Sequence, residues 1–247
     1  MNHHEDNRMA STTRTIGNVL GGIFRAISNL TRGVADAFDT VVDFAAVKVF
    51  GLPFIVLGYR QTGKTTLLEW LRSDLLTDED FQPDPTAAGG DPVPAFVAEI
   101  APNGSGMKLK PKRDVGGEYS MWETDWVDLF QQSKPRGIVF MIDHTNPYQH
   151  KDAFNFVLQM LDDEESTRRH LRYFLLLINK SDLWEEEDLT YDAILDLYRN
   201  EVRRLKSQAD RLRYQYHIEA SSLVDGPGPR DVMTDFFDAI RPKPIGE

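Results

Sequence analysis

The sequence predicts an α/β fold in which a mostly parallel central sheet is covered by helices on both faces. Three apolar runs, residues 54–57, 137–142 and 173–178, have the nearly continuous hydrophobic character of strands that are buried on both sides. Helix-like stretches near residues 64–73, 150–162 and 189–212 follow these runs. Because strands that alternate with helices are typical of parallel sheets, this order predicts crossover connections between neighbouring strands.

The remaining elements complete the sheet and its helical cover. Residues 94–101 and 107–113 are expected to form a hairpin, because the residues between them include Asn103, Gly104 and Gly106, which favour turns. Residues 216–219 are strand-like, and a last helix is expected over residues 229–240. That helix ends before Pro242, since proline lacks the N–H that a helix requires.

A phosphate-binding loop follows the first strand. The residues Gly58-Tyr59-Arg60-Gln61-Thr62-Gly63-Lys64-Thr65 have the spacing G-x-x-x-x-G-K-[ST] and stand between a strand and a helix. In such a loop, backbone N–H groups and the N-terminus of the helix surround a polyphosphate. Lys64 is expected to reach the outer phosphates, and Thr65 is expected to bind Mg²⁺. The loop alone does not separate ATP from GTP.

A second motif, Asp114-Val115-Gly116-Gly117-Glu118, follows the strand-like residues 107–110. Asp114 is expected at a strand end, where it can hold Mg²⁺ through water. Gly116 and Gly117 leave room for a backbone N–H to approach the γ-phosphate. This motif therefore predicts the part of the site that senses the third phosphate.

A third motif, Asn179-Lys180-Ser181-Asp182, ends the strand-like run 173–178. Its carboxylate suits guanine, because only guanine offers N1–H and N2–H₂ side by side to one acidic group. Adenine would leave Asp182 unpaired, at a cost of roughly 1–3 kcal/mol for an unsatisfied buried group. Ser221 follows the strand-like residues 216–219, and a backbone N–H there can meet guanine O6.

In combination these motifs resemble the Ras-like superfamily of small GTPases, and within it the Arf family and the related β subunit of the signal recognition particle receptor. The Arf-like mark is Asp114-Val115-Gly116-Gly117, since most other small GTPases have Ala at the third position. The resemblance extends from about Phe54 to Ile240. It implies a P-loop NTPase G domain that acts as a molecular switch, in which GTP and Mg²⁺ order two loops and hydrolysis releases them. A protein effector or regulator would bind through these switch loops.

The resemblance also assigns roles to individual residues. The residues implied to bind the nucleotide are Gly58, Gln61, Thr62, Gly63, Lys64, Thr65, Thr66, Gly117, Asn179, Lys180, Asp182 and Ser221. The residues implied to hold Mg²⁺ are Thr65, Thr86 and Asp114. Thr86 belongs to Asp84-Pro85-Thr86, which resembles the Pro-Thr pair of the Arf-like first switch, although residues 87–92 do not continue that pattern. The residues implied in catalysis are Glu118, Lys64 and Arg60.

Two of these residues depart from the family pattern. Glu118 occupies the place of the Gln that usually orients the attacking water, and its carboxylate adds negative charge beside a developing negative charge. Hydrolysis is therefore expected to be slow without a partner. Arg60 stands where a small or acidic residue is common. It either points into solvent or supplies positive charge to the transition state in cis.

Composition agrees with one domain of ordinary size plus extra segments, since the chain has 247 residues, of which 41% are hydrophobic. The absence of cysteine excludes disulfides and Cys-bound zinc. A formal charge of -11 and a pI of about 5.0 argue against a nucleic-acid partner, which requires clustered Lys and Arg. The expected location is cytoplasmic, with peripheral contact at the cytosolic membrane face as an alternative.

The chain is expected to divide into a flexible N-terminus at 1–13, an amphipathic helical segment at 14–50, the G domain at 51–241 and a C-terminal tail at 242–247. The apolar stripe of the second segment recurs at steps of three or four residues and consists of Ile16, Leu20, Ile23, Ile27, Leu30, Val34, Phe38, Val41 and Ala45. Three interpretations stay open for the stripe over residues 14–48. It packs on its own G domain, makes reversible contact with a membrane surface, or binds a partner's groove.

Two further alternatives stay open. Trp122 and Trp126 are either core residues of the second switch or an exposed effector surface. The acidic runs 162–165 and 185–188 are interpreted as solvated charges. For the whole chain, a hydrolysing GTPase is favoured over a GTP-bound scaffold with negligible turnover, which Glu118 keeps open, and over an ATPase, which Asp182 opposes.

Overall fold

The computed structural model of the chain describes residues 47, 50–73, 86, 89–98, 107–224 and 229–242. These residues belong to one compact unit, Ala45–Pro242. The predicted N-terminus, the amphipathic segment except Val47 and Phe50, and the tail after Pro242 lie outside the described residues. Within the described part, no helix has the length and the apolar character needed to cross a membrane.

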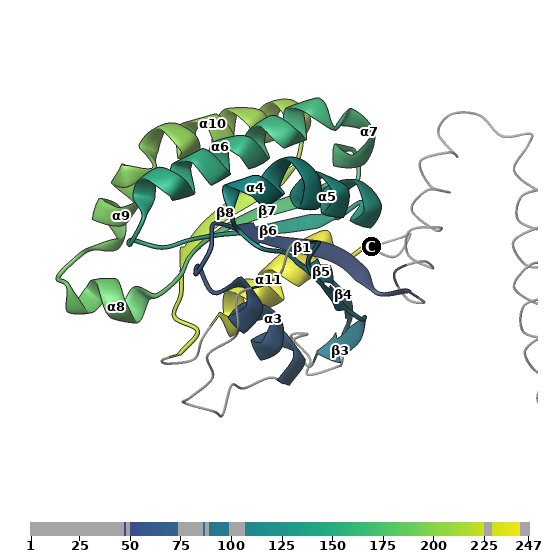
Figure 1. The fold of residues 1–247 in the computed structure, drawn as a ribbon, viewed down its shortest axis with the longest axis horizontal. Helices are drawn as coiled ribbons and strands as arrows, with labels where there is room; N and C mark the ends of the chain where they lie inside the picture. The colour runs from purple at the N-terminus through teal and green to yellow at the C-terminus, as the bar shows by residue number, and fades with distance from the viewer. Residues whose placement is uncertain are drawn as a thin grey trace, which may run out of the picture. The chain divides into compact units, whose positions relative to one another are not determined.

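Six strands form the central sheet in the order β3-β4-β1-β6-β7-β8 (Figure 1). Their bounds are β1 (Leu52–Gly58), β3 (Phe96–Ala98), β4 (Met107–Lys110), β6 (Gly137–Ile142), β7 (Tyr173–Ile178) and β8 (Gln215–Ala220). Every neighbouring pair is parallel except β3 and β4, which are antiparallel. The mostly parallel sheet and the hairpin that were predicted from the sequence are thus confirmed.

Helices cover both faces of this sheet. On one face lie α3 (Lys64–Ser73) and α11 (Arg230–Ile240), and on the other lie α4 (Tyr119–Met121), the π-helix η1 (Trp122–Trp126), α5 (Val127–Ser133), α6 (Pro147–Asp163) and α10 (Arg199–Leu212) (Figure 1). The short helices α7 (Glu165–Arg168), α8 (Ser181–Glu186) and α9 (Tyr191–Leu197) stand in the connections. The predicted two-sided cover is confirmed.

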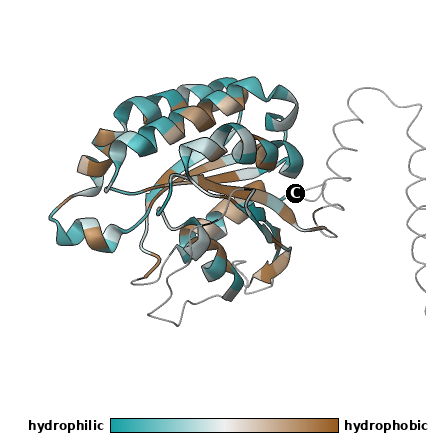
Figure 2. Cartoon of the chain, viewed as in Figure 1, coloured by the Kyte–Doolittle hydropathy of each residue, from teal (hydrophilic) through white to brown (hydrophobic). Residues whose placement is uncertain are grey.

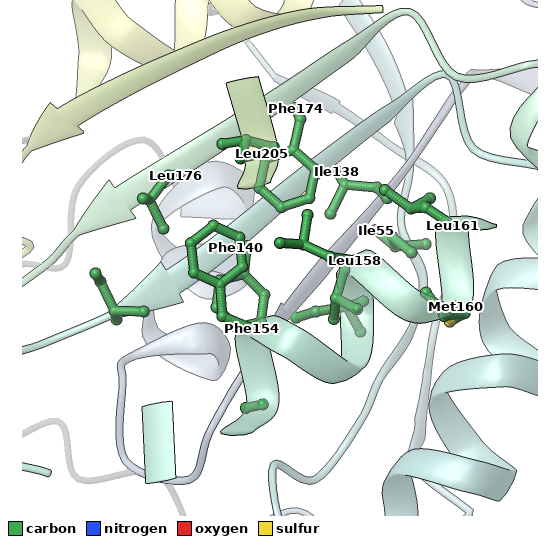
Figure 3. Close-up of a cluster of buried hydrophobic side chains, with 14 of the residues drawn as sticks. Ile55, Ile138, Phe140, Phe154, Leu158, Met160, Leu161, Phe174, Leu176 and Leu205 are labelled. Atoms are coloured by element: carbon green, nitrogen blue, oxygen red, sulfur yellow. The ribbon is translucent and has the colours of Figure 1, made fainter. Parts of the chain in front are cut away.

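Strands β1, β6 and β7 are apolar at nearly every position, because their successive side chains enter two different cores. In β1, Ile55 and Leu57 pack with the α6 side, whereas Phe54 and Val56 pack with α3 and α11. Hydrophobic residues accordingly concentrate on the strands (Figure 2). In the first core, the ring of Phe140 stacks on that of Phe154 of α6, with the ring centroids 4.9 Å apart (Figure 3). Packing in these two cores holds the strands in place, and with them the carboxyl ends of the strands, where a site can form.

The segment predicted as one strand over 107–113 is divided into β4 and β5 (Lys112–Asp114). Pro111 lacks an N–H for the ladder, and Lys112 has a φ of 74°, so the chain turns between the two strands. Strand β5 then pairs antiparallel with β2 (Asp91–Val93), which places Asp91 opposite Asp114. This turn brings Asp114 out of the central sheet.

The helical stretch predicted over 189–212 is also divided, at Tyr198 between α9 and α10. Tyr198 is fully buried, and its hydroxyl donates a hydrogen bond of 3.0 Å to the carbonyl of Asp143. The acidic run 162–165 was predicted to be solvated, but Asp162 of α6 forms an ion pair with Arg211 of α10. The distance from Asp162 Oδ1 to Arg211 Nη2 is 2.6 Å. Both contacts hold α10 against the elements beside it.

Candidate functional site

A cavity of about 500 Å³ lies at the carboxyl ends of β1, β5, β7 and β8. In open α/β sheets this edge is where ligands bind. The predicted site residues that line it are Arg60, Gln61, Gly63, Lys64, Thr65, Thr66, Thr86, Gly117, Glu118, Asn179, Lys180 and Asp182. Segments far apart in the sequence therefore contribute to one cavity.

The loop between β1 and α3 is the predicted phosphate-binding loop, and its backbone takes positive φ angles at two positions. Gln61 has a φ of 62° and Gly63 a φ of 92°, and a Cβ on Gly63 would lie 2.5 Å from Asn179 Nδ2. The hydroxyl of Thr62 and the ammonium of Lys64 both donate to the carbonyl of Tyr59, at 2.9 and 3.0 Å. These two hydrogen bonds connect side chains of the loop to its own backbone and so stabilise its conformation.

Lys64 is the first residue of α3, and it is 6% exposed. Burial lowers the pKa of Lys64 to about 8, although the charge of Asp114 opposes that shift. An ammonium in such a place is costly without an anion, because desolvation disfavours the charged form. A polyphosphate in the cavity would add negative charge beside this ammonium.

The three residues predicted to hold Mg²⁺ come together from three segments. The hydroxyl of Thr65 donates to Asp114 Oδ2 at 2.5 Å, and that of Thr86 donates to the same oxygen at 3.2 Å. The other oxygen, Asp114 Oδ1, is buried and has no hydrogen-bond partner among the described residues. Hydroxyl and carboxylate oxygens are the ligands that Mg²⁺ prefers, so this group of side chains fits that ion.

No cluster of three or more His, Cys, Asp or Glu side chains is present in the described part of the chain. Mg²⁺ usually binds through one or two carboxylates together with substrate phosphates and waters. Asp114 would be the carboxylate in such a site.

Two indoles hold the motif that follows Asp114. Trp126 Nε1 donates to the carbonyl of Gly116 at 2.8 Å, and Trp122 Nε1 donates to that of Gly117 at 3.1 Å. Trp122 is 3% exposed and Trp126 is fully buried, so both are core residues rather than an exposed surface. They stand in the π-helical turn η1, a rare geometry that is frequent at functional sites.

Gly117 lies so close to the backbone of the loop between β1 and α3 that no side chain fits. A Cβ there would lie 2.3 Å from the Arg60 nitrogen and 2.5 Å from the Gly58 oxygen, both of which are backbone atoms. We expect Gly117→Ala to lower the free energy of unfolding by about 1–3 kcal/mol through overpacking. Chemical denaturation of the purified variant measures this change.

Gly116→Ala is the matched control for that substitution. Its nearest obstacle is the Met121 sulfur, 2.2 Å from the built Cβ, which belongs to the end of a flexible side chain. We therefore expect Gly116→Ala to cost clearly less than Gly117→Ala. Equal costs for both variants would show that the close approach of Gly117 to the loop is not what limits this position.

Glu118 and Arg60 line the cavity and are both exposed. Glu118 is the N-cap residue of α4 and has an extended backbone. Its side chain does not accept a capping hydrogen bond from the backbone of that helix. The guanidinium carbon of Arg60 lies 5.7 Å from the centre of the Tyr59 ring. Both positions leave room for these side chains to turn toward a ligand or toward solvent.

The other end of the cavity is formed by the loop after β7. Asn179 Nδ2 donates to the carbonyl of Thr62 at 2.9 Å, which ties this loop to the loop between β1 and α3. Asp182 is half-buried and lines the cavity. Leu183, Leu223 and Val224 add an apolar wall beside it that the sequence reasoning missed. The apolar pair Leu223-Val224 directly after Ser222 was the available sequence signal.

Ser221 does not line this cavity, contrary to the expectation that it contacts the base. Its N–H donates to the carbonyl of Ile178 at 2.9 Å, and its own carbonyl accepts from the N–H of Ser181 at 3.1 Å. Ser221 therefore supports the loop that carries Asp182. Gly58 and Thr62 are likewise buried behind the cavity lining.

The site joins a cationic, N–H-rich end to an acidic end with an apolar wall, a combination that suits a phosphorylated ligand carrying a base. Comparisons with protein-family models and with curated proteins gave no match to the chain.

Proposed function

We propose that the chain binds guanine nucleotides with Mg²⁺ and hydrolyses GTP as a molecular switch of the Arf-like type. The observation that carries the proposal is the meeting of Thr65, Thr86 and Asp114 beside the buried Lys64. Thr65, Thr86 and Asp114 lie 21 to 49 positions apart in the sequence, and the resemblance to small GTPases implies that they hold one Mg²⁺. A purely structural loop would not require this convergence.

Each end of the cavity has a role in this proposal. Bound Mg²⁺ would neutralise charge that develops on the phosphates during transfer. Lys64 would pair with the outer phosphates, and the N–H groups of the loop would surround them. Asp182 would accept hydrogen bonds from N1–H and N2–H₂ of guanine. The hairpin of β3 and β4 supports the assignment, because a G domain places such a pair between its two switch loops.

A GTP-bound scaffold with negligible hydrolysis is the second candidate function. The exposed carboxylate of Glu118 at the cavity favours it, since the family uses a neutral Gln to orient water. Nucleotide extracted from protein purified without added ligand, followed by single-turnover hydrolysis, tests both candidates. Bound guanine nucleotide with a rate near 10⁻⁴ to 10⁻² s⁻¹, on the order of intrinsic rates in such switches, supports the hydrolysing switch. Bound GTP without measurable turnover supports the scaffold.

The charge of Glu118 gives a separate prediction about the rate. We expect Glu118→Gln to hold or raise single-turnover hydrolysis, because the amide keeps the length and hydrogen-bonding reach without repelling the γ-phosphate. Glu118→Ala should lower the rate. Loss of hydrolysis in Glu118→Gln as complete as in Glu118→Ala, at constant GTP affinity, would show that the carboxylate itself is required.

A further inference from the structure

We propose that Asp143 is a positioning residue for the base end of the site, where it fixes Lys180 and with it the loop Asn179–Asp182. Asp143 follows β6 directly and does not line the cavity, whereas Lys180 does. The inference rests on the proposed nucleotide function, to which it adds a residue that none of the sequence motifs contains.

Asp143 holds the ammonium of Lys180 with a buried carboxylate. Asp143 Oδ2 lies 2.6 Å from Lys180 Nζ, and the side chains are 1% and 25% exposed. The second oxygen, Oδ1, accepts hydrogen bonds from the N–H and the hydroxyl of Thr145, at 2.9 and 2.6 Å. The carboxylate therefore has a fixed orientation before it meets Lys180.

The backbone of Lys180 explains why such a partner is needed. Lys180 has a φ of 62° and a ψ of 41°, the left-handed conformation that residues other than glycine adopt only when their surroundings enforce it. The residue stands between Asn179, which binds the phosphate loop, and Asp182 in the cavity. The ion pair between Lys180 and Asp143 fixes this turn, and the turn orients Asn179 and Asp182.

A second layer of buried groups holds Asp143 in turn. His150 Nδ1 lies 3.1 Å from the Asp143 nitrogen, and the Tyr198 hydroxyl donates to the Asp143 carbonyl at 3.0 Å. Burial lowers the pKa of His150 and raises that of Tyr198, so the imidazole is neutral and the phenol keeps its proton at pH 7. The break between α9 and α10 places Tyr198 for this contact.

The charge on Asp143 is likewise secured by its partners. Burial alone would raise the pKa of Asp143, but hydrogen bonds from Lys180 and Thr145 hold that pKa below its ordinary value. The group is therefore an anion at neutral pH. Asp143→Asn keeps the shape of the side chain while it removes the charge that binds Lys180.

Dissociation of a fluorescent GDP analogue measures the role of Asp143. We expect Asp143→Asn to release the nucleotide about 10- to 100-fold faster, the effect of losing one hydrogen bond between charged groups. Lys180→Met should give a similar acceleration. The double variant should release the nucleotide no faster than Lys180→Met alone, because Asp143 acts through Lys180.

Asp162→Asn is the matched control. It removes the charge of a carboxylate that pairs with Arg211 and does not line the cavity, so it should leave the rate of release unchanged.

The outcomes separate the inference from the proposed function. Release from Asp143→Asn at the wild-type rate, or additive effects of the two substitutions, would overturn the role of Asp143 while guanine binding stands. Wild-type protein that prefers ATP would overturn the proposed function, and the same series with labelled ATP would then test Asp143. Wild-type protein that binds neither nucleotide would overturn both. If Asp143→Asn does not fold by circular dichroism, Thr145→Ala should show a smaller acceleration in the same direction.

Discussion

Replacing Lys64 with Ala is expected to abolish stable nucleotide binding while the protein remains folded. Lys64 is the buried lysine of the predicted phosphate-binding loop, and its ammonium donates a hydrogen bond of 3.0 Å to the carbonyl of Tyr59. Loss of its contacts with phosphate should weaken affinity by at least about 100-fold. Titration calorimetry with GTP and Mg²⁺ measures this loss.

The fold should survive because a buried ammonium contributes little stability of its own. Burial already lowers the pKa of Lys64 to about 8, which reflects the cost of keeping the charge out of water. Nucleotide-free Lys64→Ala should therefore melt close to wild type. Lys151→Ala removes a lysine that lies over the Tyr148 ring outside the cavity, and it should bind GTP normally. Mg²⁺-dependent GTP affinity retained in Lys64→Ala would show that the loop is structural only.

Replacing Asp182 with Asn is expected to change the preferred base from guanine to xanthine. In our proposal Asp182 accepts hydrogen bonds from N1–H and N2–H₂ of guanine. The amide of Asn would instead donate a hydrogen bond to the carbonyl oxygen that xanthine carries in place of the amino group. GTP affinity should fall by about 10- to 100-fold, and affinity for xanthosine triphosphate should rise. Competition between the two nucleotides on the variant measures the exchange.

Glu185→Gln is the control for that substitution. Glu185 stands on the same short helix α8 but does not line the cavity, so removal of its charge should not alter base preference. Asp182→Asn that keeps the wild-type preference for guanine would assign base recognition to another group. The apolar wall of Leu183, Leu223 and Val224 does not distinguish the bases by hydrogen bonding.

The centre of the sheet could be predicted from the sequence because β1, β6 and β7 are buried on both faces. The runs at 54–57, 137–142 and 173–178 are apolar at every position, and they became β1, β6 and β7. The breaks at Pro111 and Tyr198 could not be predicted in the same way. Pro111 was a local signal for the first break, because proline cannot donate to the ladder, but the pairing with β2 that follows it is a tertiary contact. The break at Tyr198 accompanies a hydrogen bond to a residue 55 positions away.

In the site, too, residues within local motifs could be predicted, whereas residues whose positions depend on tertiary contacts could not. Lys64, Thr65 and Asp182 could be placed at one cavity because their motifs fix the spacing of the residues that, in our proposal, would bind phosphate, metal and base. Asp143 and the two indoles stand outside such motifs, and their roles depend on where β6 and η1 are placed. Ser221 was predicted to contact the base, but its N–H is committed to Ile178 at 2.9 Å, because the β8 ladder continues by one residue.

The most direct measurement for the proposed function is the affinity of the wild-type protein for GTP and for ATP, each with Mg²⁺, by titration calorimetry. The proposal predicts that GTP binds at least about 10- to 100-fold more tightly, since adenine would leave Asp182 without its two donors. EDTA should weaken GTP binding, because Thr65, Thr86 and Asp114 would then lack the ion that joins them to the phosphates. Equal affinity for GTP and ATP would contradict the assignment of this chain as a guanine-nucleotide switch.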